Sequence, residues 1–236
     1  MKLTWDEAAK RLYETGVDRV VLFPMTSTPA TGSDYGTGVA WNGVTGITEN
    51  PEGADANDIY ADNMKYLSLI SVENWKATIK AYTWPTEFNE CQGEFEYDDG
   101  TTRGIYFGQQ PHTKFALAWR TIVGNAVQGD SYGYKLHVAY GLTAAPSEKD
   151  HATVNDSPEA TEFSWDLNSI PDAFTSIANS GLQPVSHIVV DSTLNLNGYK
   201  ALEAALFGTD ESAVGEGDDQ DPYIPTPDGL ITLVNI

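Results

Sequence analysis

Acidic side chains are the residues of this chain whose types and spacing could do chemistry. Glycoside hydrolysis needs one carboxyl group as the acid and a second as base or nucleophile, about 5–10 Å apart. Six carboxylates follow one another between positions 87 and 99: Glu87, Glu90, Glu94, Glu96, Asp98 and Asp99. Because 34 of the 236 residues are acidic, such a pair arises by chance, and we expect no catalysis there.

Oxygen and nitrogen ligands for a cation also occur, but without a metal-binding order. The acidic candidates are Glu216, Asp218, Asp219 and Asp221. They lack the D-x-[DN]-x-[DN]-G order and the distal Glu of an EF-hand loop, which favours a solvated acidic loop. The histidines, which show no H-x-x-x-H or comparable spacing, are His112, His137, His151 and His187. His137 and His187 fall within strand patterns, where a position on a sheet surface explains them, so we predict no metal site.

Nucleophile and phosphate motifs are missing from the sequence as well. Ser147 lies in APSEKD and not in G-x-S-x-G, and no glycine-rich loop opens a helix. Cys91 is the only cysteine, so neither an intrachain disulfide nor a cysteine metal cluster can form. The sequence therefore predicts a protein that is not an enzyme, has no catalytic residues, binds no cofactor and folds in a reducing cytoplasm.

The net charge of −21 is concentrated toward the C-terminus. Residues 1–149 carry a net charge of −7 and residues 150–236 carry −14, with Lys200 as the one base of the second segment. Such a surface repels phosphates, which argues against tight nucleic-acid binding. No apolar run approaches the roughly 20 residues that span a bilayer, and the N-terminus lacks an apolar signal core, so we expect no membrane or secretion route.

Alternating strands dominate the pattern that must position these residues. In 76–84 the apolar residues Ala77, Ile79 and Ala81 alternate with a second face of Lys76, Thr78, Lys80 and Tyr82. Further strands are expected at 17–23, 37–41, 105–107, 114–123, 134–142 and 161–167. The strand at 134–142 has one apolar face of Tyr134, Leu136, Val138 and Tyr140. This spacing predicts a mainly β fold of two packed antiparallel sheets, a sandwich or partly closed barrel.

Helices and loops complete a single expected domain over 1–236. A capping box of Thr4 and Glu7 predicts a short N-terminal helix at about 5–15. One flanking α-helix is expected at 198–207, with Asn197 as N-cap and Gly208 after its end. The last residues, 230–234, are expected to form a short strand. The polar stretch 43–63 reads as an exposed loop or arm, and 208–228 as an acidic loop.

Three segments carry a resemblance to a known family. They are YADNMKYLSLISVENWKATIKAYTWPTEFNECQG at 60–93, KFALAWRTIVGN at 114–125, and YKLHVAYGLTAAPSEKDHATVNDSPEATEFSWDLNSIP at 134–171. The segment at 134–171 contains, in order, a strand, a PSE turn, an NDSPEA turn and an FSW strand. Together these segments, about half of the chain, resemble the major tail tube protein of long-tailed, siphovirus-type bacteriophages.

The resemblance implies a structural virion protein whose rings of six stack into the tail tube, the conduit for genome delivery. The implied partners are other copies of the chain, the tape measure protein, and the tail tip and tail terminator proteins. Genomic DNA would pass through an acidic bore without specific binding. The alternative explanation of the acidic charge is that it only keeps the chain soluble. The implied location is the virion tail, with the host cytoplasm during assembly.

Candidate contact residues follow from this reading. Ring formation by sheet pairing is expected to involve Lys76, Thr78, Lys80, Tyr82, Tyr134, Leu136, Val138 and Tyr140. Contacts between stacked rings are expected in the 43–63 arm, at Glu49, Glu52, Asp55, Asp58, Tyr60 and Asp62. The N-terminal segment and 208–228 are further candidates for stacking contacts.

Two alternatives from other classes stay open. Six Trp and twelve Tyr allow a carbohydrate-binding β-sandwich module of a phage or secreted protein, whose mark is a row of exposed aromatic rings on one concave face. An acidic glycoside hydrolase that depends on Glu87 or Glu90 is a more distant third.

Overall fold

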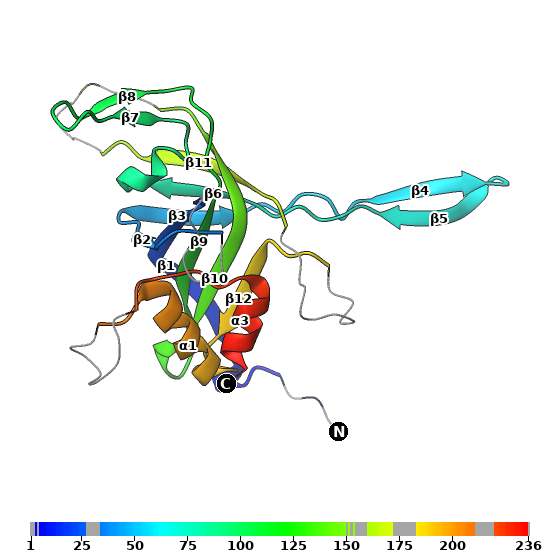
Figure 1. The fold of residues 1–236 in the computed structure, drawn as a ribbon. Coiled ribbons are helices and arrows are strands. Elements are labelled where there is room, and N and C mark those ends of the chain that lie inside the picture. The colour runs from blue at the N-terminus through cyan, green and yellow to red at the C-terminus, as the bar shows by residue number, and fades with distance from the viewer. Residues whose placement is uncertain are drawn as a thin grey trace.

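A continuous eight-stranded antiparallel sheet forms the centre of the molecule in the computed structural model (Figure 1). The structure describes residues 3, 5–26, 34–149, 151, 153, 160–171, 183–210 and 220–235. Its strands are β1 (Leu12–Pro24), β2 (Val39–Ala40), β3 (Val44–Glu49), β4 (Ala56–Ala61), β5 (Met64–Ile70), β6 (Lys76–Ala81), β7 (Phe95–Tyr97), β8 (Ile105–Phe107), β9 (Phe115–Asn125), β10 (Gly129–Pro146), β11 (Phe163–Ser169) and β12 (His187–Asp191). The helical elements are the 3₁₀ turns η1 (Ala8–Lys10) and η2 (Thr86–Phe88) and the α-helices α1 (Leu196–Phe207) and α3 (Pro227–Val234).

The long strand β10 organises the sheet, whose order is β2-β1-β9-β10-β11-β6-β3 with β12 also paired to β10. One edge of β10 pairs with β9, while its other edge pairs first with β12 and then with β11. Gly141 lies where β10 passes from β12 to β11, at φ 62°. A Cβ there would stand 2.3 Å from the Ile170 carbonyl oxygen, so this bend requires glycine.

The sheet curls so that its two halves pack face to face across an apolar core. Strands β1 and β9 supply Leu22 and Phe115, and the opposite half supplies Ile79 and Trp165, all fully buried in one cluster. Aromatic rings fill the centre: the Trp165 centroid lies 5.6 Å from that of Trp41 and 5.4 Å from that of Phe88. The period-2 strand faces of the sequence therefore become the two sides of one core.

The opposite face of β1, β9 and β10 is covered by the two α-helices. Leu136, Val138 and Tyr140 of β10 are buried there against Leu202 of α1 and Leu230 of α3. Figure 1 shows both helices together at the end of the sheet opposite β7 and β8. A mainly β fold with packed antiparallel sheets and a flanking helix is thus confirmed, although the packed layers are halves of one sheet.

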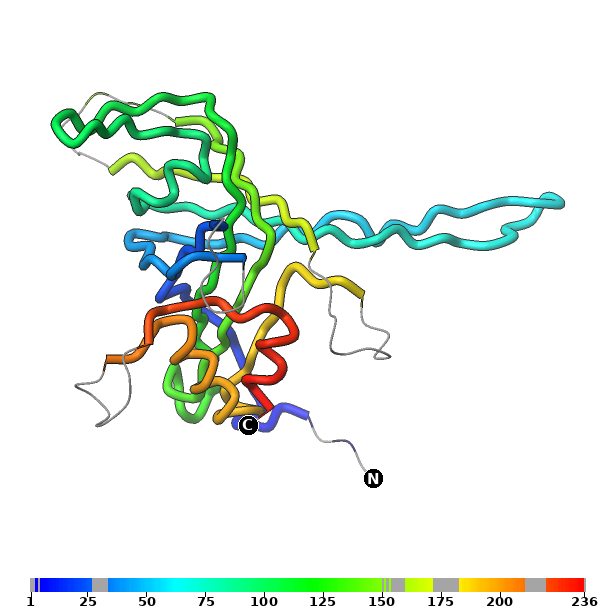
Figure 2. Tube along the Cα trace, viewed as in Figure 1, coloured from blue at the N-terminus to red at the C-terminus, as the bar shows by residue number. Residues whose placement is uncertain are grey.

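A long β-hairpin projects from the β3–β6 pair. Glu52 and Asn74 bridge between that pair and β4–β5, so the chain runs out and back as one ribbon. Figure 2 shows this ribbon extending away from the rest of the described chain. Its tip is the two-residue loop Asp62 and Asn63, at φ 51° and 62°, the positive-φ pair of a type I′ turn. We call residues 50–75 the arm.

The arm corrects the expectation of a loop at 43–63. Residues 44–49 form β3, and 56–61 form β4, which pairs with β5. The polar side chains of this stretch reflect exposure and not irregular backbone, because a ribbon with both faces in solvent has no face that must be apolar throughout.

The N-terminal helix expected at 5–15 is wrong. Only the 3₁₀ turn η1 forms there, and β1 begins at Leu12. Residues 12–15 pair with residues 122–125 of β9. Pairing with a long neighbouring strand outweighs the local helix preference, which is worth only tenths of a kcal/mol per residue. Thr4, half of the expected capping box, lies outside the described residues.

The C-terminal expectations are met in part. Helix α1 forms and buries Tyr199, Leu202, Ala205 and Leu206 as expected, but Asn195 and not Asn197 is its N-cap. The strand expected at 230–234 is wrong, because these residues belong to α3, which begins with Pro227 after the capping residue Thr226. Of the loop expected at 208–228, residues 211–219 lie outside the description, and its last two residues are helical.

No helix among the described residues has the length and apolar character needed to span a bilayer.

Candidate functional site

The arm presents an apolar surface that nothing in the described chain covers. Ile59 faces Leu67 across the β4–β5 pair, and Leu69 lies next on the same face. These three side chains are 40%, 37% and 54% exposed. Further exposed apolar residues of the arm are Tyr60, Met64, Tyr66, Ile70 and Val72. Exposed apolar surfaces of this kind are typical of sites where proteins contact other molecules, so the arm is a candidate contact site.

The acidic residues expected to make contacts between rings lie along the arm and its root. Asp58 pairs with Lys65 at 2.7 Å and accepts a hydrogen bond from Ser68. Glu52 pairs with Lys76 at 2.6 Å at the root of the arm. Asp55 and Tyr60 are exposed, Asp62 is in the turn, and Glu49 ends β3. The carboxylates of Asp58 and Glu52 are therefore paired within the arm and at its root, and the apolar side chains are its candidate contact surface.

A second exposed apolar face lies on the β7–β8 hairpin. The pairs Phe95–Phe107 and Tyr97–Ile105 share one face. All four side chains are between 41% and 51% exposed. On the other face, Tyr106 and Tyr82 line a groove of about 420 Å³ with Trp84 and Phe163. The sequence analysis predicted the β8 strand but did not single out this surface.

The residues expected to form the ring fall into two groups. Lys76, Thr78 and Lys80 lie on the outer face of β6, where Lys80 is exposed, and Tyr82 follows the end of the strand. By contrast, Leu136, Val138 and Tyr140 are fully buried beneath α1 and α3, and Tyr134 packs against the same core. Within the described chain, this β10 face belongs to the core of the molecule itself.

Four of the six carboxylates considered for hydrolysis line one groove. Glu87, Glu90, Glu94 and Glu96 surround a volume of about 370 Å³ beside β7. Glu94 pairs with Lys149 at 3.2 Å, and Glu96 accepts a hydrogen bond from the Gly104 amide. The remaining two, Asp98 and Asp99, accept hydrogen bonds within the β7–β8 turn. The acidic residues considered for cation binding at 216–219 lie outside the described residues.

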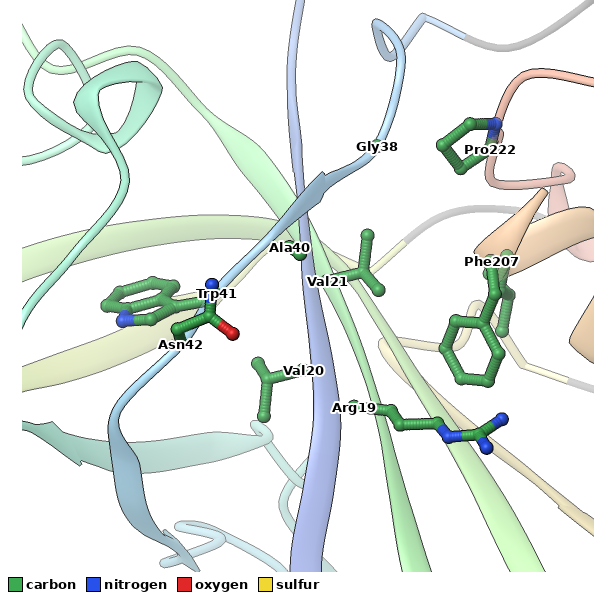
Figure 3. Close-up of a pocket in the computed structure, with 10 residues that line it drawn as sticks. Arg19, Val20, Val21, Gly38, Ala40, Trp41, Asn42, Phe207 and Pro222 are labelled. Atoms are coloured by element: carbon green, nitrogen blue, oxygen red, sulfur yellow. The ribbon is translucent and has the colours of Figure 1, made fainter.

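A groove of about 540 Å³ lies between β1, β2 and the end of α1 (Figure 3). Figure 3 shows Arg19 and Phe207 on one side and Trp41 on the other. The Arg19 guanidinium pairs with Glu203 at 3.0 Å and lies 5.5 Å from the Phe207 ring centroid. Among the described residues that line this groove, Arg19 is the one ionisable side chain, so the groove offers no acid–base pair.

Arg120 connects the sheet to α1, because its guanidinium lies 3.6 Å from the carboxylate of Glu203 in that helix. Its guanidinium makes two hydrogen bonds to the Asp18 carboxylate, at 2.8 and 2.6 Å, and lies 4.4 Å from the Tyr134 ring centroid. Its side chain is 12% exposed. The hydrogen bonds that Arg120 donates to Asp18 raise the pKa of Arg120 further above its ordinary value, against the effect of burial.

A histidine pair lies at the root of the arm, inside the curl of the sheet. His137 of β10 and His187 of β12 are diagonal neighbours on one face, with 3.2 Å between His137 Nδ1 and His187 Nε2. Glu49, at the end of β3, places its carboxylate 4.0 Å from His137 and 3.6 Å from His187. Burial lowers the pKa of both histidines, to about 4 for His187, against the carboxylates that raise it. Both imidazoles are therefore neutral at pH 7.

The thiol of Cys91 is fully buried beside Phe88. Burial, together with the charge of Glu90, raises its pKa to about 12. Because the thiolate is the reactive form, this cysteine is chemically quiet in the native state and serves the core.

These features define a mainly β protein with a curled antiparallel sheet, helices on one face and two exposed apolar hairpins. No protein-family model and no curated protein matches the chain. Among solved structures, the chain is similar to one chain of the cryo-EM structure of the anti-feeding prophage (AFP) baseplate, 6-fold symmetrised, at a TM-score of 0.32 and 9% identity. That alignment covers 80% of this chain and 97% of the other.

Proposed function

We propose that this protein is a structural subunit of a bacteriophage tail, which assembles into hexameric rings that stack as the tail tube and conduct the genome. The proposal joins the resemblance of residues 60–93, 114–125 and 134–171 to tail tube proteins with the surfaces described above. Its partners are then other copies of the chain, the tape measure protein and the proteins at the two ends of the tail.

The observation that carries the proposal is the arm. A two-stranded ribbon standing alone in water is marginally stable at best, yet this one exposes large apolar side chains on both faces. Both its regular strand pairing and its apolar composition fit a segment that a neighbouring subunit covers. An arm that reaches away from its own subunit suits contact between stacked rings, where the same heterologous contact repeats along an axis without closing.

Open sheet edges supply the second contact that a ring needs. In the described chain, β2 and β3 end the sheet path, and neither has a further partner strand. Such edges pair readily with another chain. Pairing around a ring removes them, and backbone hydrogen bonds and apolar burial would have to outweigh the repulsion between chains that each carry a net charge of −21.

Electron microscopy of the purified full-length chain tests the proposal. Negative staining over a range of concentrations should show rings or hollow tubes of uniform width with a regular axial repeat. If the chain stays monomeric, tail-tip complexes are added as seeds. Failure to form tubes under both conditions overturns the proposal.

Matched variants test whether stacking depends on the apolar surface of the arm or on any exposed apolar residue. Leu67→Thr combined with Leu69→Thr keeps the β propensity of the strand while removing apolar surface from the arm, and should leave rings but abolish stacking. The control is Leu194→Thr, because Leu194 is 88% exposed in the turn before α1. If both variants form tubes like the wild type, the arm is not the stacking contact.

A carbohydrate-binding module is the second candidate, favoured by the aromatic rings around β7 and β8. Tyr82, Tyr106 and Trp84 share one groove, and aromatic faces of this kind stack on sugar rings. A glycan array with the full chain separates the two candidates. Binding that Tyr106→Ala abolishes, in a chain that forms no tubes, would replace assembly as the function.

A further inference from the structure

We propose that Glu49, His137 and His187 bind a divalent transition-metal ion of the Zn²⁺ class, which fastens the root of the arm to the central sheet. This metal site is independent of the proposed tail function. The three side chains come from β3, β10 and β12, and one ligand atom from each lies within 4.8 Å of the others.

The two histidine nitrogens are as far apart as a tetrahedral ion requires, and Glu49 must move closer to them for binding. Bonds of 2.0–2.1 Å at tetrahedral angles place two ligand atoms about 3.3 Å apart. His137 Nδ1 and His187 Nε2 are 3.2 Å apart, and Glu49 Oε1 is 4.0 Å from His137 Nδ1. The two imidazole rings are nearly parallel, at 12°, so binding needs a rotation of one ring that turns both lone pairs toward the ion.

The hydrogen-bond network leaves the correct nitrogen of His137 free to bind. The Thr121 hydroxyl donates its single hydrogen to Glu14 Oε1, at 2.7 Å. His137 Nε2 lies 3.0 Å from the same hydroxyl oxygen, so the hydrogen of that contact must come from Nε2. The Nδ1 lone pair therefore points toward His187 and Glu49. A histidine ligand held through its second nitrogen by a hydroxyl–carboxylate chain is the usual outer shell of a metal site.

The other two ligands are oriented in the same way. The Trp75 indole N–H donates to Glu49 Oε2 at 3.2 Å, which leaves Oε1 for the ion. When His187 binds through Nε2, its hydrogen resides on Nδ1, 3.6 Å from Glu49 Oε2. The proton of His187 therefore moves from Nε2 to Nδ1, and no proton has to leave the site. The Trp119 indole lies parallel to both imidazoles, within 8°, and forms the floor of the site.

The donor set selects the class of ion. Two imidazoles and one carboxylate suit Zn²⁺ and its first-row neighbours, whereas Mg²⁺ and Ca²⁺ prefer oxygen ligands alone. Entry is possible through a groove of about 560 Å³ that Glu49, Trp119 and His137 line. That groove also gives room for a water as the fourth ligand.

Zinc titration of the full-length chain, freed of metal with a chelator, tests the site. Calorimetry is done with Mg²⁺ in excess, so that the acidic surface is already occupied. We expect one Zn²⁺ per chain, and Co²⁺ in its place should give the visible absorption of a tetrahedral complex. His187→Gln and Glu49→Gln should each weaken binding at least about tenfold, whereas the control His151→Gln should not change it.

Two results overturn the proposal. One is the absence of saturable Zn²⁺ binding by the wild type, and the other is equal binding by the wild type, His187→Gln and Glu49→Gln. Glu49 is exposed, so Glu49→Gln remains a valid test if His187→Gln fails to fold by circular dichroism. Hydrogen exchange gives a readout of the structural role: Zn²⁺ should slow amide exchange in residues 50–75 of the wild type and not of Glu49→Gln.

Discussion

The arm and the central sheet use the same antiparallel pairing but differ in what surrounds their side chains. In the sheet, Trp165 and Phe115 are fully buried between packed layers, while in the arm Tyr60 and Ile70 are 68% and 73% exposed. Backbone hydrogen bonds are alike in the two regions, so they cannot be what makes one region stable alone. Because apolar burial is the main favourable contribution to folding, we expect the sheet to be stable by itself and the arm to gain stability from a partner that covers it.

The largest effect should follow from opening the core. Trp165→Ala removes a ring that contacts Trp41, Trp84 and Phe88 and donates to Gln92 Oε1 at 2.9 Å. We expect the free energy of unfolding to fall by about 3–5 kcal/mol, measured by urea denaturation. Alkylation of the buried Cys91 thiol should accelerate in parallel.

The matched control for that variant is Trp5→Ala, since Trp5 is 78% exposed. It should change the free energy of unfolding by less than about 0.5 kcal/mol. Similar losses from both tryptophans would mean that burial does not distinguish the sheet from its surroundings.

An intermediate effect is expected for the ion pair of Arg120. Arg120→Met leaves Asp18 without its two hydrogen bonds, and because Asp18 is 42% exposed water compensates part of the loss. We expect a decrease of about 1–2 kcal/mol in the free energy of unfolding. The control is Lys65→Met in the arm, whose pair with Asp58 is also short at 2.7 Å but exposed, and it should cost about 0.5 kcal/mol or less. Equal costs would contradict the contrast between the two regions.

The smallest effect should come from the tip of the arm. Asn63→Gly places glycine at a position with φ 62°, which glycine adopts without strain. The amides of residues 56–70 should exchange more slowly by up to about fivefold, a local gain below about 1 kcal/mol, while urea denaturation stays unchanged. Ala61→Gly is the control and should speed exchange, because glycine at this last residue of β4 gains conformational freedom in the unfolded arm without relieving a positive φ.

The alternation of apolar and polar residues allowed most of the sheet to be predicted, but not the two ends of the chain. Strands β6, β9, β10 and β11 were predicted because one face of each is apolar and faces a core. The 5–15 and 230–234 predictions failed for different reasons. The first was overridden by pairing with β9, which no local pattern shows. The second had a readable signal, Thr226 followed by Pro227, an N-cap with proline at the first helical position.

The candidate surfaces were only partly accessible to sequence reasoning. The 43–63 segment was expected to make contacts, yet its hairpin was missed, although Asp62–Asn63 between Tyr60 and Met64 is a turn signal. The Glu49, His137 and His187 cluster could not be found by motif spacing. Its members are 88 and 50 positions apart in the chain, and only the curl of the sheet brings β3 beside β10 and β12.

Because the arm continues the β3–β6 pair outward, the resistance of the molecule to force should depend on where and in which direction the force acts. Ladder hydrogen bonds run perpendicular to the strands, so a pull along β10 loads its many bonds to β9 together and must shear them at once. A sideways force that parts β4 from β5 at the root of the arm, where the two strands are not joined by a turn, loads one pair at a time and separates the ribbon toward the Asp62–Asn63 turn. Under tension, the molecule should therefore yield first in the arm, while the sheet keeps its shape.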